Sequence, residues 1–381
     1  TAKVLHEHGI DAEVVAKIHE NEDNNTLTLI ESGKIAYVIS TSSKGRIPTR
    51  DSVKIRRKTV EWNIPCLTSI DTANAIAASI RSKYTESTTE IVDINNMRTE
   101  KQTFEFTKMQ GCGNDYIYFN CFDQRIDNPE GLALNLSDRH FGIDGVILIC
   151  RSKVADAKMR MFNLDGSEGK MCGNGIRCVA KFMRDNGIVD KDEMTIETLS
   201  GIMTVSLIRH YGEVSGATVN MGKAILAPHL VPVELEPDEN GRVVDRKVNI
   251  AGNDYNITCV SMGNPHAVVF MNNVDSLDID KVGPEFEHDK IFPERVNAEF
   301  IKVIDDHTLK MRVWERGSGE TWACGTGACA AAVAAVLNGF CKKDEEISVI
   351  LKGGTLKIRY TDEAVYLTGD AVTVFSGHIV M

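Results

Sequence analysis

The chain has 381 residues, of which 43% are hydrophobic and 25% are charged, a composition typical of globular protein with sizeable cores. Its formal net charge is −11, and the whole excess lies after residue 98, because residues 1–98 carry 13 basic and 13 acidic residues. An acidic main part argues against nucleic acid as a partner, and no apolar run reaches the ~20 residues of a membrane span. The first ten residues lack the apolar segment of a secretory signal, so we expect a cytoplasmic protein that has no membrane partner.

Residues 1–81 are predicted to form a small α/β module with a parallel sheet, because helical and strand patterns alternate along them. The predicted helices cover residues 2–10, 26–34, 52–63 and 73–84, and the predicted strands cover residues 12–19, 35–41 and 64–69. The run from Lys44 to Lys58 holds seven Lys or Arg residues against Asp51 alone. Such a cluster is either a solvated face or an anion site.

Residues 82–103 are polar and aperiodic, so we interpret them as a linker. Strands dominate from there on, with alternating segments and turn glycines at residues 194–222 and a predicted meander at residues 347–380. Two helical segments, residues 173–187 and 325–339, interrupt the strands, and the second is apolar enough to be buried. We therefore expect an α+β fold of two halves, 104–225 and 226–381, each a curved sheet around a central helix.

The two halves repeat a pattern at four offsets. Cys172-Gly-Asn-Gly and Cys324-Gly-Thr-Gly lie 152 positions apart, and a glutamate stands four positions before each cysteine. Asn163 and Glu315 stand nine positions before, and the Gly-Asn pairs at 113–114 and 263–264 lie further upstream. Agreement at four offsets indicates a duplicated half-domain with one functional cysteine in each copy.

Both cysteines directly precede a predicted helix, and this placement indicates proton-transfer chemistry. A helix N-terminus offers unpaired N–H groups and partial positive charge, which favour a thiolate and can hold a substrate carboxylate. We expect both cysteines to have pKa values below the usual ~8.5. Two such thiols on opposite sides of one carbon suit epimerisation, in which one removes the α-proton and the other delivers a new one. Such chemistry requires no pyridoxal phosphate, and we expect no cofactor.

Other interpretations of these residues are weaker. The spacing of the ten cysteines fits neither a disulfide framework nor structural zinc, so we expect reduced thiols and no metal. The Gly-x-Gly segments lack the full G-x-G-x-x-G pattern of dinucleotide sites. The remaining cysteines, including Cys178 and Cys329 inside the two helices, are interpreted as packing residues.

Residues 104–381 resemble the diaminopimelate epimerase family. The resemblance rests on FTKMQGCGNDYIYFN, MFNLDGSEGKMCGNGIRC, MGNPHAVVF, ERVNAEF and WERGSGETWACGTGACAAA. It implies cofactor-independent interconversion of LL- and meso-diaminopimelate, on the route to lysine and peptidoglycan, by an enzyme that is commonly a homodimer. It also implies that Cys172 and Cys324 are the acid and base, assisted by His266 and Glu315. The substrate-binding residues that it implies are Asn114, Asn163, Gly173, Asn174, Asn264, Asn297, Glu315, Arg316, Gly325 and Thr326. The family usually reads RHFGIGADG where this chain has the shorter RHFGIDG, a difference that bears on specificity.

Residues 1–80 resemble the methylglyoxal-synthase-like regulatory domain of the carbamoyl phosphate synthase large chain, through YVISTSSKGR and RDSVKIRRKTVEWNIPCLTSIDTANAIA. This resemblance implies an effector phosphate site at Thr41, Ser42, Lys44 and Arg46. The domain is expected to be partial, since its first strands and helix have no counterpart here, and the chain starts with Thr1 as an excised piece would. Two other functions remain open: a racemase of the same fold that acts on histidine or proline, and a non-catalytic regulatory module.

Overall fold

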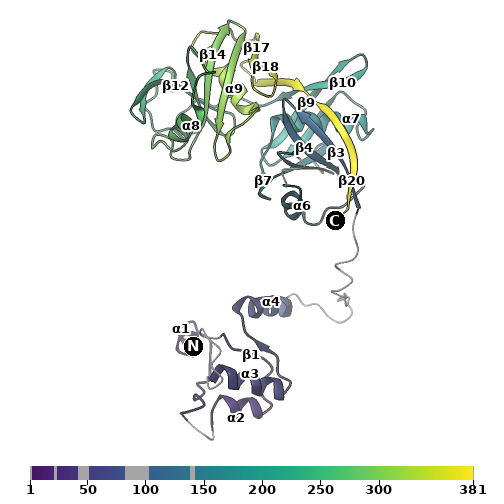
Figure 1. The fold of residues 1–381 in the computed structure, drawn as a ribbon, viewed down its shortest axis with the longest axis vertical. Helices are drawn as coiled ribbons and strands as arrows, with labels where there is room; N and C mark the ends of the chain where they lie inside the picture. The colour runs from purple at the N-terminus through teal and green to yellow at the C-terminus, as the bar shows by residue number, and fades with distance from the viewer. Residues whose placement is uncertain (1, 21–23, 42–50, 82–102, 138–141, 381) are drawn as a thin grey trace. The chain divides into compact units, whose positions relative to one another are not determined.

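The computed structural model describes residues 2–20, 24–41, 51–81, 103–137 and 142–380 (Figure 1). The chain forms two compact units, Thr1–Glu100 and Lys101–Met381. The predicted linker at 82–103 lies outside the described residues except for its last residue, which begins a strand.

The first unit has the predicted alternation of helices and parallel strands. Strands β1 and β2 pair in parallel, and a capping box formed by Asn25 and Thr28 begins α2. In chain order the elements are α1 (Ala2–Glu7), α2 (Thr26–Glu31), β1 (Val38–Ile39), α3 (Asp51–Glu61), β2 (Cys66–Leu67) and α4 (Ile70–Arg81).

Of the three predicted strands in this unit, one is absent, and the other two, at 35–41 and 64–69, are each shortened to two residues. Residues 12–19 contain no strand, only an isolated bridge between Ala16 and Asn25. The expected buried strand at 35–41 shrinks to the two residues of β1, and the side chain of Ile39 is 57% exposed. A strand is buried only where neighbouring strands and helices cover it, and within the described residues β1 has the short β2 as its one strand partner.

The second unit begins with a mixed sheet wrapped around a helix. Strand β3 pairs with β4, β4 runs parallel to β5, and β6 pairs with β5, β7 and β8. Strands β8, β9 and β10 then form the predicted antiparallel run. The elements are β3 (Thr103–Gly111), β4 (Asn114–Asn120), α6 (Pro129–Leu136), β5 (Gly145–Cys150), β6 (Ala157–Asn163), β7 (Glu168–Gly169), α7 (Gly173–Asp185), β8 (Glu193–Thr198), β9 (Gly201–His210) and β10 (Glu213–Asn220).

The rest of the unit repeats this topology. Strand β12 pairs with β13, β13 runs parallel to β14, and β15 pairs with β14, β16 and β17 in the same senses as β6 with its partners. The elements are β11 (Arg246–Ile250), β12 (Asn253–Ser261), β13 (Pro265–Phe270), α8 (Ile279–Glu287), β14 (Asn297–Asp305), β15 (Thr308–Glu315), β16 (Gly319–Glu320), α9 (Gly325–Leu337), β17 (Glu346–Ile350), β18 (Thr355–Tyr360), β19 (Val365–Asp370) and β20 (Val372–Val380). The duplication inferred from the sequence is therefore present in the fold.

The C-terminal meander is confirmed for β17, β18 and β19, but β20 leaves it. Strand β19 already pairs with β18 on one side and with β10 on the other, so no edge remains for β20. Strand β20 instead pairs with β3 along its whole length and completes the sheet of the first half (Figure 1). The two halves are thus joined by two strand pairings.

Each sheet encloses one of the two predicted helices. Helix α9 is buried along most of its length, as expected from its run of Ala and Val. Helix α7 is also largely buried, and both helices contribute to one hydrophobic core that extends through both halves. Because that core fixes both helices, it also fixes the residues at their N-termini.

Candidate active site

Cys172 and Cys324 are the N-cap residues of α7 and α9. Each has extended backbone angles, and each sulfur accepts a hydrogen bond from a backbone N–H three residues on, Gly175 or Gly327, at 3.3 Å. The side chains therefore cap the helices and point at the positive end of the dipole. The predicted placement of both cysteines is confirmed.

The first turns of the two helices touch each other. A Cβ built on Gly325 would lie 3.4 Å from Asn174 Oδ1 and 3.7 Å from Gly173 Cα. Leu367, on β19, packs against both Gly173 and Gly325. This approach of the helix ends brings the two cysteine-bearing N-termini to one place in the molecule.

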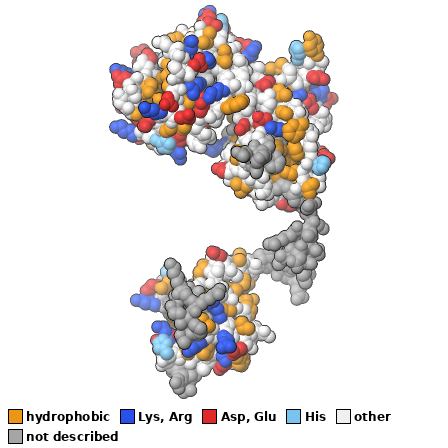
Figure 2. Space-filling model, in the orientation of Figure 1, with side chains coloured by type: hydrophobic (Ala, Val, Ile, Leu, Met, Phe, Trp, Pro, Cys, Tyr) orange, Lys and Arg blue, Asp and Glu red, His pale blue; other side chains and the backbone are white. Residues whose placement is uncertain are grey.

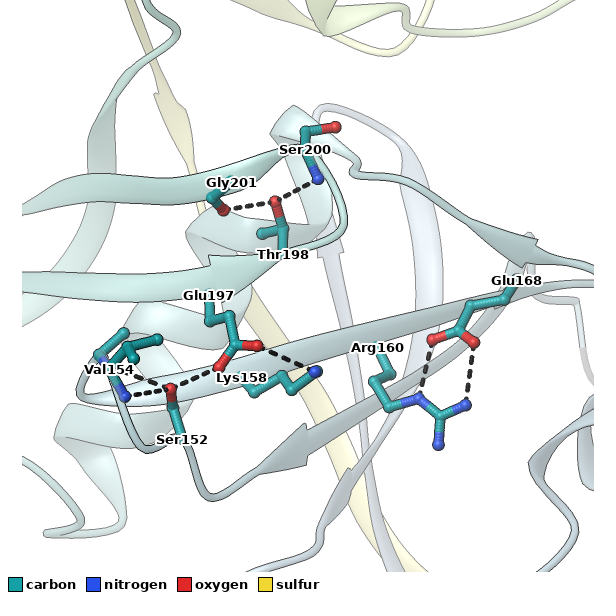
Figure 3. A network of polar contacts seen from close by, with 10 residues as sticks. Ser152, Val154, Lys158, Arg160, Glu168, Glu197, Thr198, Ser200 and Gly201 are labelled. Carbon is teal, nitrogen blue, oxygen red and sulfur yellow. Dashed lines mark hydrogen bonds and ion pairs between the residues drawn. The ribbon is translucent and has the colours of Figure 1, made fainter.

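The repeated glutamates have a structural role. Glu168 accepts two hydrogen bonds from Arg160, which ties β7 to β6, and Lys158 with Glu197 ties β6 to β8 beside it (Figure 3). In the second half, Glu320 accepts one hydrogen bond from Arg312 and one from Lys352. The Arg160–Glu168 and Arg312–Glu320 pairs hold the segment that leads into each cysteine.

The predicted asparagines of the first half are partly brought together. Asn174 donates to Asn114 Oδ1 at 2.5 Å, and Asn114 donates to Asp144 Oδ2 at 3.1 Å. Asn163 lies at the end of β6 and donates to Ser167 in the following turn. The short RHFGIDG loop is described only from Gly142 onward, and it is this loop that supplies Asp144.

The second half forms a tighter polar cluster. His266, fully buried on β13, contacts Asn264 Oδ1 through Nε2 at 3.0 Å and Glu299 through Nδ1 at 2.6 Å. Asn264 also donates to Thr326 Oγ1 at 3.3 Å, at the start of α9. Cys324 Sγ lies 3.5 Å from the same hydroxyl. This chain of contacts links the predicted residues to the second cysteine.

The remaining predicted residues lie where β14 and β15 meet the loops. Asn297 accepts a hydrogen bond from the Arg316 backbone at 2.9 Å and donates to Pro265 O at 2.8 Å. The Arg316 guanidinium donates to Glu294 O. Glu315 accepts a hydrogen bond from Thr321, and its charge interacts with Cys324, which connects it to the site.

Most of the expected effector site lies outside the described residues, and the site stays a prediction. Thr41 is described and exposed, whereas Ser42, Lys44 and Arg46 lie outside the described residues. Within the described ranges, no group of three or more His, Cys, Asp or Glu residues is placed to hold a metal ion. No helix among the residues that the structure describes is long and apolar enough to cross a membrane.

Sequence reasoning missed several residues of the site. The Tyr116 hydroxyl donates to Cys172 Sγ at 3.6 Å, and Arg177, fully buried, donates to Gly173 O and Asn174 Oδ1. Asp144 and Glu299 were also missed. The offset of 150 that relates the two Gly-Asn pairs also relates Tyr116 to His266, so the duplication carried a signal for Tyr116.

The expectation of lowered thiol pKa values was wrong for the substrate-free structure. Burial raises the pKa of Cys172, although the Gly175 N–H, the Tyr116 hydroxyl and nearby Arg177 oppose this. Burial raises the pKa of Cys324 well above its usual range, and the carboxylates of Glu315 and Glu299 add to the effect. Loss of hydration therefore outweighs the helix N-terminus at both thiols.

These raised values predict the pH dependence of catalysis. A reaction that starts from a thiolate requires one cysteine to ionise, so kcat/KM is expected to rise with pH up to and beyond the ordinary thiol value of about 8.5. A steady-state pH profile measures this limb directly. A limb completed below pH 7 would contradict the burial argument.

The contact between the helix ends predicts the effect of one added methyl group. In Gly325→Ala the new Cβ would meet the Leu367 side chain at 3.2 Å, so this side chain, which packs against both helix ends, must shift by a few tenths of an ångström. Because proton transfer depends on alignment, we expect kcat to fall roughly tenfold with little change in melting temperature. Steady-state kinetics and a thermal melt separate the two effects, and unchanged kcat would show that the spacing is not critical.

Solved structures of known proteins share this fold. The Bacillus anthracis phenazine biosynthesis protein of the PhzF family aligns with 74% of this chain and 100% of its own, with a TM-score of 0.53 and 18% identity. A hydroxyproline epimerase from Agrobacterium vitis aligns with 74% of this chain and 94% of its own, with a TM-score of 0.56 and 14% identity. The second unit therefore has the fold of this structural class.

Sequence comparison identifies the family within that class. The sequence model described as diaminopimelate epimerase matches residues 106–227 and 258–374, and the one described as MGS-like domain matches residues 1–68. The diaminopimelate epimerase of Desulfovibrio desulfuricans is 56% identical over 280 residues, which cover 71% of this chain and 96% of that protein. Those of Acetivibrio thermocellus and Methanococcus maripaludis are 51% and 50% identical over 72% of this chain. The chain belongs to the diaminopimelate epimerase family and is an isomerase.

Proposed function

We propose that this chain interconverts LL- and meso-diaminopimelate without a cofactor, as a step toward lysine and peptidoglycan precursors. The observation that carries the proposal is the pair of cysteines at the N-caps of two equivalent helices whose first turns touch. Relatives about half identical to this chain bear the name of that activity. All ten cysteines are free thiols, as a reducing cytoplasm would keep them.

The proposed reaction moves two protons. One thiolate takes the α-proton of the substrate, and the electron pair left on carbon is delocalised into the α-carboxylate. The N–H groups of Gly173 and Asn174, or of Gly325 and Thr326, stabilise that charge at the helix ends. The opposite thiol then gives its proton to the other face of the carbon, so one thiolate is consumed and one is formed. Glu315, whose charge interacts with Cys324, is placed to exchange that thiol's proton.

The distal amino acid end of the substrate requires groups of both signs. Arg316 suits a bidentate carboxylate contact, and Glu315 suits an ammonium group. Asn163 and Asn297 offer amides that can read either end. These assignments follow the family resemblance, and the positions of Asn297 and Arg316 beside each other support them.

A substrate panel tests the proposal. The purified chain is given LL-diaminopimelate, histidine or proline under reducing conditions, and the stereoisomers formed are separated by chiral chromatography. We expect the meso isomer from LL-diaminopimelate and no racemisation of the other two. Racemisation of histidine or proline alone would assign the chain to a different reaction of this fold, and inactivity toward all three would favour a regulatory module.

We also propose that two copies of the chain associate through β20. Within the described residues β20 pairs only with β3, and its side chains Val374 and Phe375 are about half exposed, at 50% and 52%. An apolar strand with a free edge favours pairing with a second copy. Analytical ultracentrifugation is expected to give a dimer, and Val374→Lys, which places a charge on this edge, is expected to give monomers. A wild-type monomer at micromolar concentration would contradict the proposal.

A further inference from the structure

The two halves differ at one buried position beside the cysteines. Tyr116 pairs with Gly145 in the first half, and His266 pairs with Asn297 in the second. Two residues further along, Ile147 and Glu299 therefore occupy equivalent places. A Cβ built on Gly175 would meet Ile147 at 2.7 Å, and one built on Gly327 would meet Glu299 Oε1 at 2.8 Å. A methyl group in one half is thus replaced by a carboxylate in the other.

The Glu299 carboxylate is close to Cys324. A Cβ on Gly327 would lie 2.8 Å from Glu299 Oε1 and 3.2 Å from Cys324 Sγ. The carboxylate and the thiol therefore share the space that this glycine leaves. Glu299 is fully buried, and its Oε1 contacts His266 Nδ1 at 2.6 Å. Its Oε2 is buried with no hydrogen-bond partner among the described residues. The contact with His266 holds the carboxylate beside the thiol.

The groups that face Glu299 come from four elements. His266 on β13 is its partner, and Cys259 on β12, Glu315 on β15 and Cys324 on α9 all interact with its charge. Glu315 is a second acid beside the same thiol. Around Cys172 the charges are reversed, since a tyrosine hydroxyl donates to the sulfur and the buried Arg177 lies nearby. A thiolate is disfavoured by nearby carboxylates and favoured by donors and cations.

We propose that Glu299 is a positioning residue of the epimerase: its carboxylate, fixed by His266, keeps Cys324 protonated in the substrate-free enzyme, so that Cys172 ionises first. The consequence of this order for the two isomers rests on the proposed function. The isomer whose α-proton faces Cys172 then reacts at once. The other isomer requires the Cys324 proton to leave and Cys172 to gain one, both by exchange with solvent. Glu299 therefore selects which of two equivalent-looking thiols begins the cycle.

The ratio of kcat/KM in the two directions is fixed by the equilibrium constant of the reaction, so it does not report which cysteine ionises first. The ionisation of each cysteine is therefore measured directly. Substrate-free enzyme is alkylated with iodoacetamide across pH 6–10, and the labelling rate of each cysteine is followed by peptide mass spectrometry. In the wild type we expect Cys172 to reach half of its maximal rate at a lower pH than Cys324. In Glu299→Gln we expect the rate at Cys324 to rise about tenfold at a fixed pH, with a smaller change at Cys172.

Two comparisons make the test specific. Glu197→Gln removes a carboxylate that binds Ser152 and Lys158 at the edge of β8, and it is expected to leave both labelling curves unchanged. If Glu299→Gln does not fold, the order in which Cys172 and Cys324 become reactive with rising pH in the wild type still tests the proposal. Labelling of Cys324 before Cys172, or no response of Cys324 to Glu299→Gln, would overturn the proposal. Labelling needs no substrate, so an ordered response with no diaminopimelate turnover would count against the proposed function instead.

Discussion

Replacing either Cys172 or Cys324 with alanine is expected to lower kcat by about 10² to 10⁴-fold, the range that a positioned acid or base contributes. Both thiols are needed because one must accept a proton from carbon while the other donates one. Each variant keeps one thiol, so it can still exchange the α-proton of the isomer that faces this thiol. Loss of epimerisation with retained exchange of one isomer is the result to look for by chiral chromatography and NMR.

Cys178→Ala and Cys329→Ala are the matched controls. These cysteines lie on the same two helices, are fully buried, and pack in the core away from the N-caps. We expect near-normal kcat from both, with a modest loss of stability from the lost packing. Near-normal turnover by Cys172→Ala or Cys324→Ala would rule out the two-thiol reaction.

Arg177→Met is expected to lower the free energy of unfolding by about 3 kcal/mol, because several buried acceptors lose their donor at once. The guanidinium donates to Gly173 O and Asn174 Oδ1 at the start of α7, and to Asp370 O at the end of β19. It therefore ties the first helix end to a strand of the second half. Methionine keeps much of the volume, so the change isolates the hydrogen bonds. Urea denaturation measures the effect.

The same substitution is expected to reduce catalysis, since Arg177 orients Asn174 and favours the Cys172 thiolate. Arg184→Met, two turns along α7, is the control: that side chain pairs with the exposed Asp190, and such a pair is worth under about 1 kcal/mol. Equal stability of Arg177→Met and Arg184→Met would show that the buried guanidinium does not hold the helix end.

The duplication explains why so much of the second unit could be predicted. Repeated offsets around Cys172 and Cys324 gave two equivalent halves, and the strong helix signals after each cysteine gave α7 and α9. The exit of β20 toward β3 could not be predicted, because it depends on both edges of β19 being occupied by strands distant in sequence. In the first unit, local β propensity predicted a strand at 12–19 for which the described fold offers only a single bridge.

The residues of the candidate site likewise fall into those that the sequence predicted and those that it did not. Residues in glycine-rich motifs were found because their spacing is visible in the sequence. Glu299 and Arg177 were missed because their importance comes from burial beside a helix end. Both side chains lie beneath the surface that Figure 2 shows. The pKa direction was missed for the same reason, since sequence shows the helix N-terminus but not the desolvation that outweighs it.

The central claim is that two thiols act on opposite faces of one carbon, and deuterium labelling tests it most directly. LL-diaminopimelate is incubated with the enzyme in heavy water, and substrate and product are separated while conversion is small. A two-thiol reaction predicts that the meso product carries deuterium at the inverted carbon while the remaining LL substrate stays unlabelled. Protium retained at the inverted carbon of the product would mean that one group moves the same proton across both faces, and it would contradict the account.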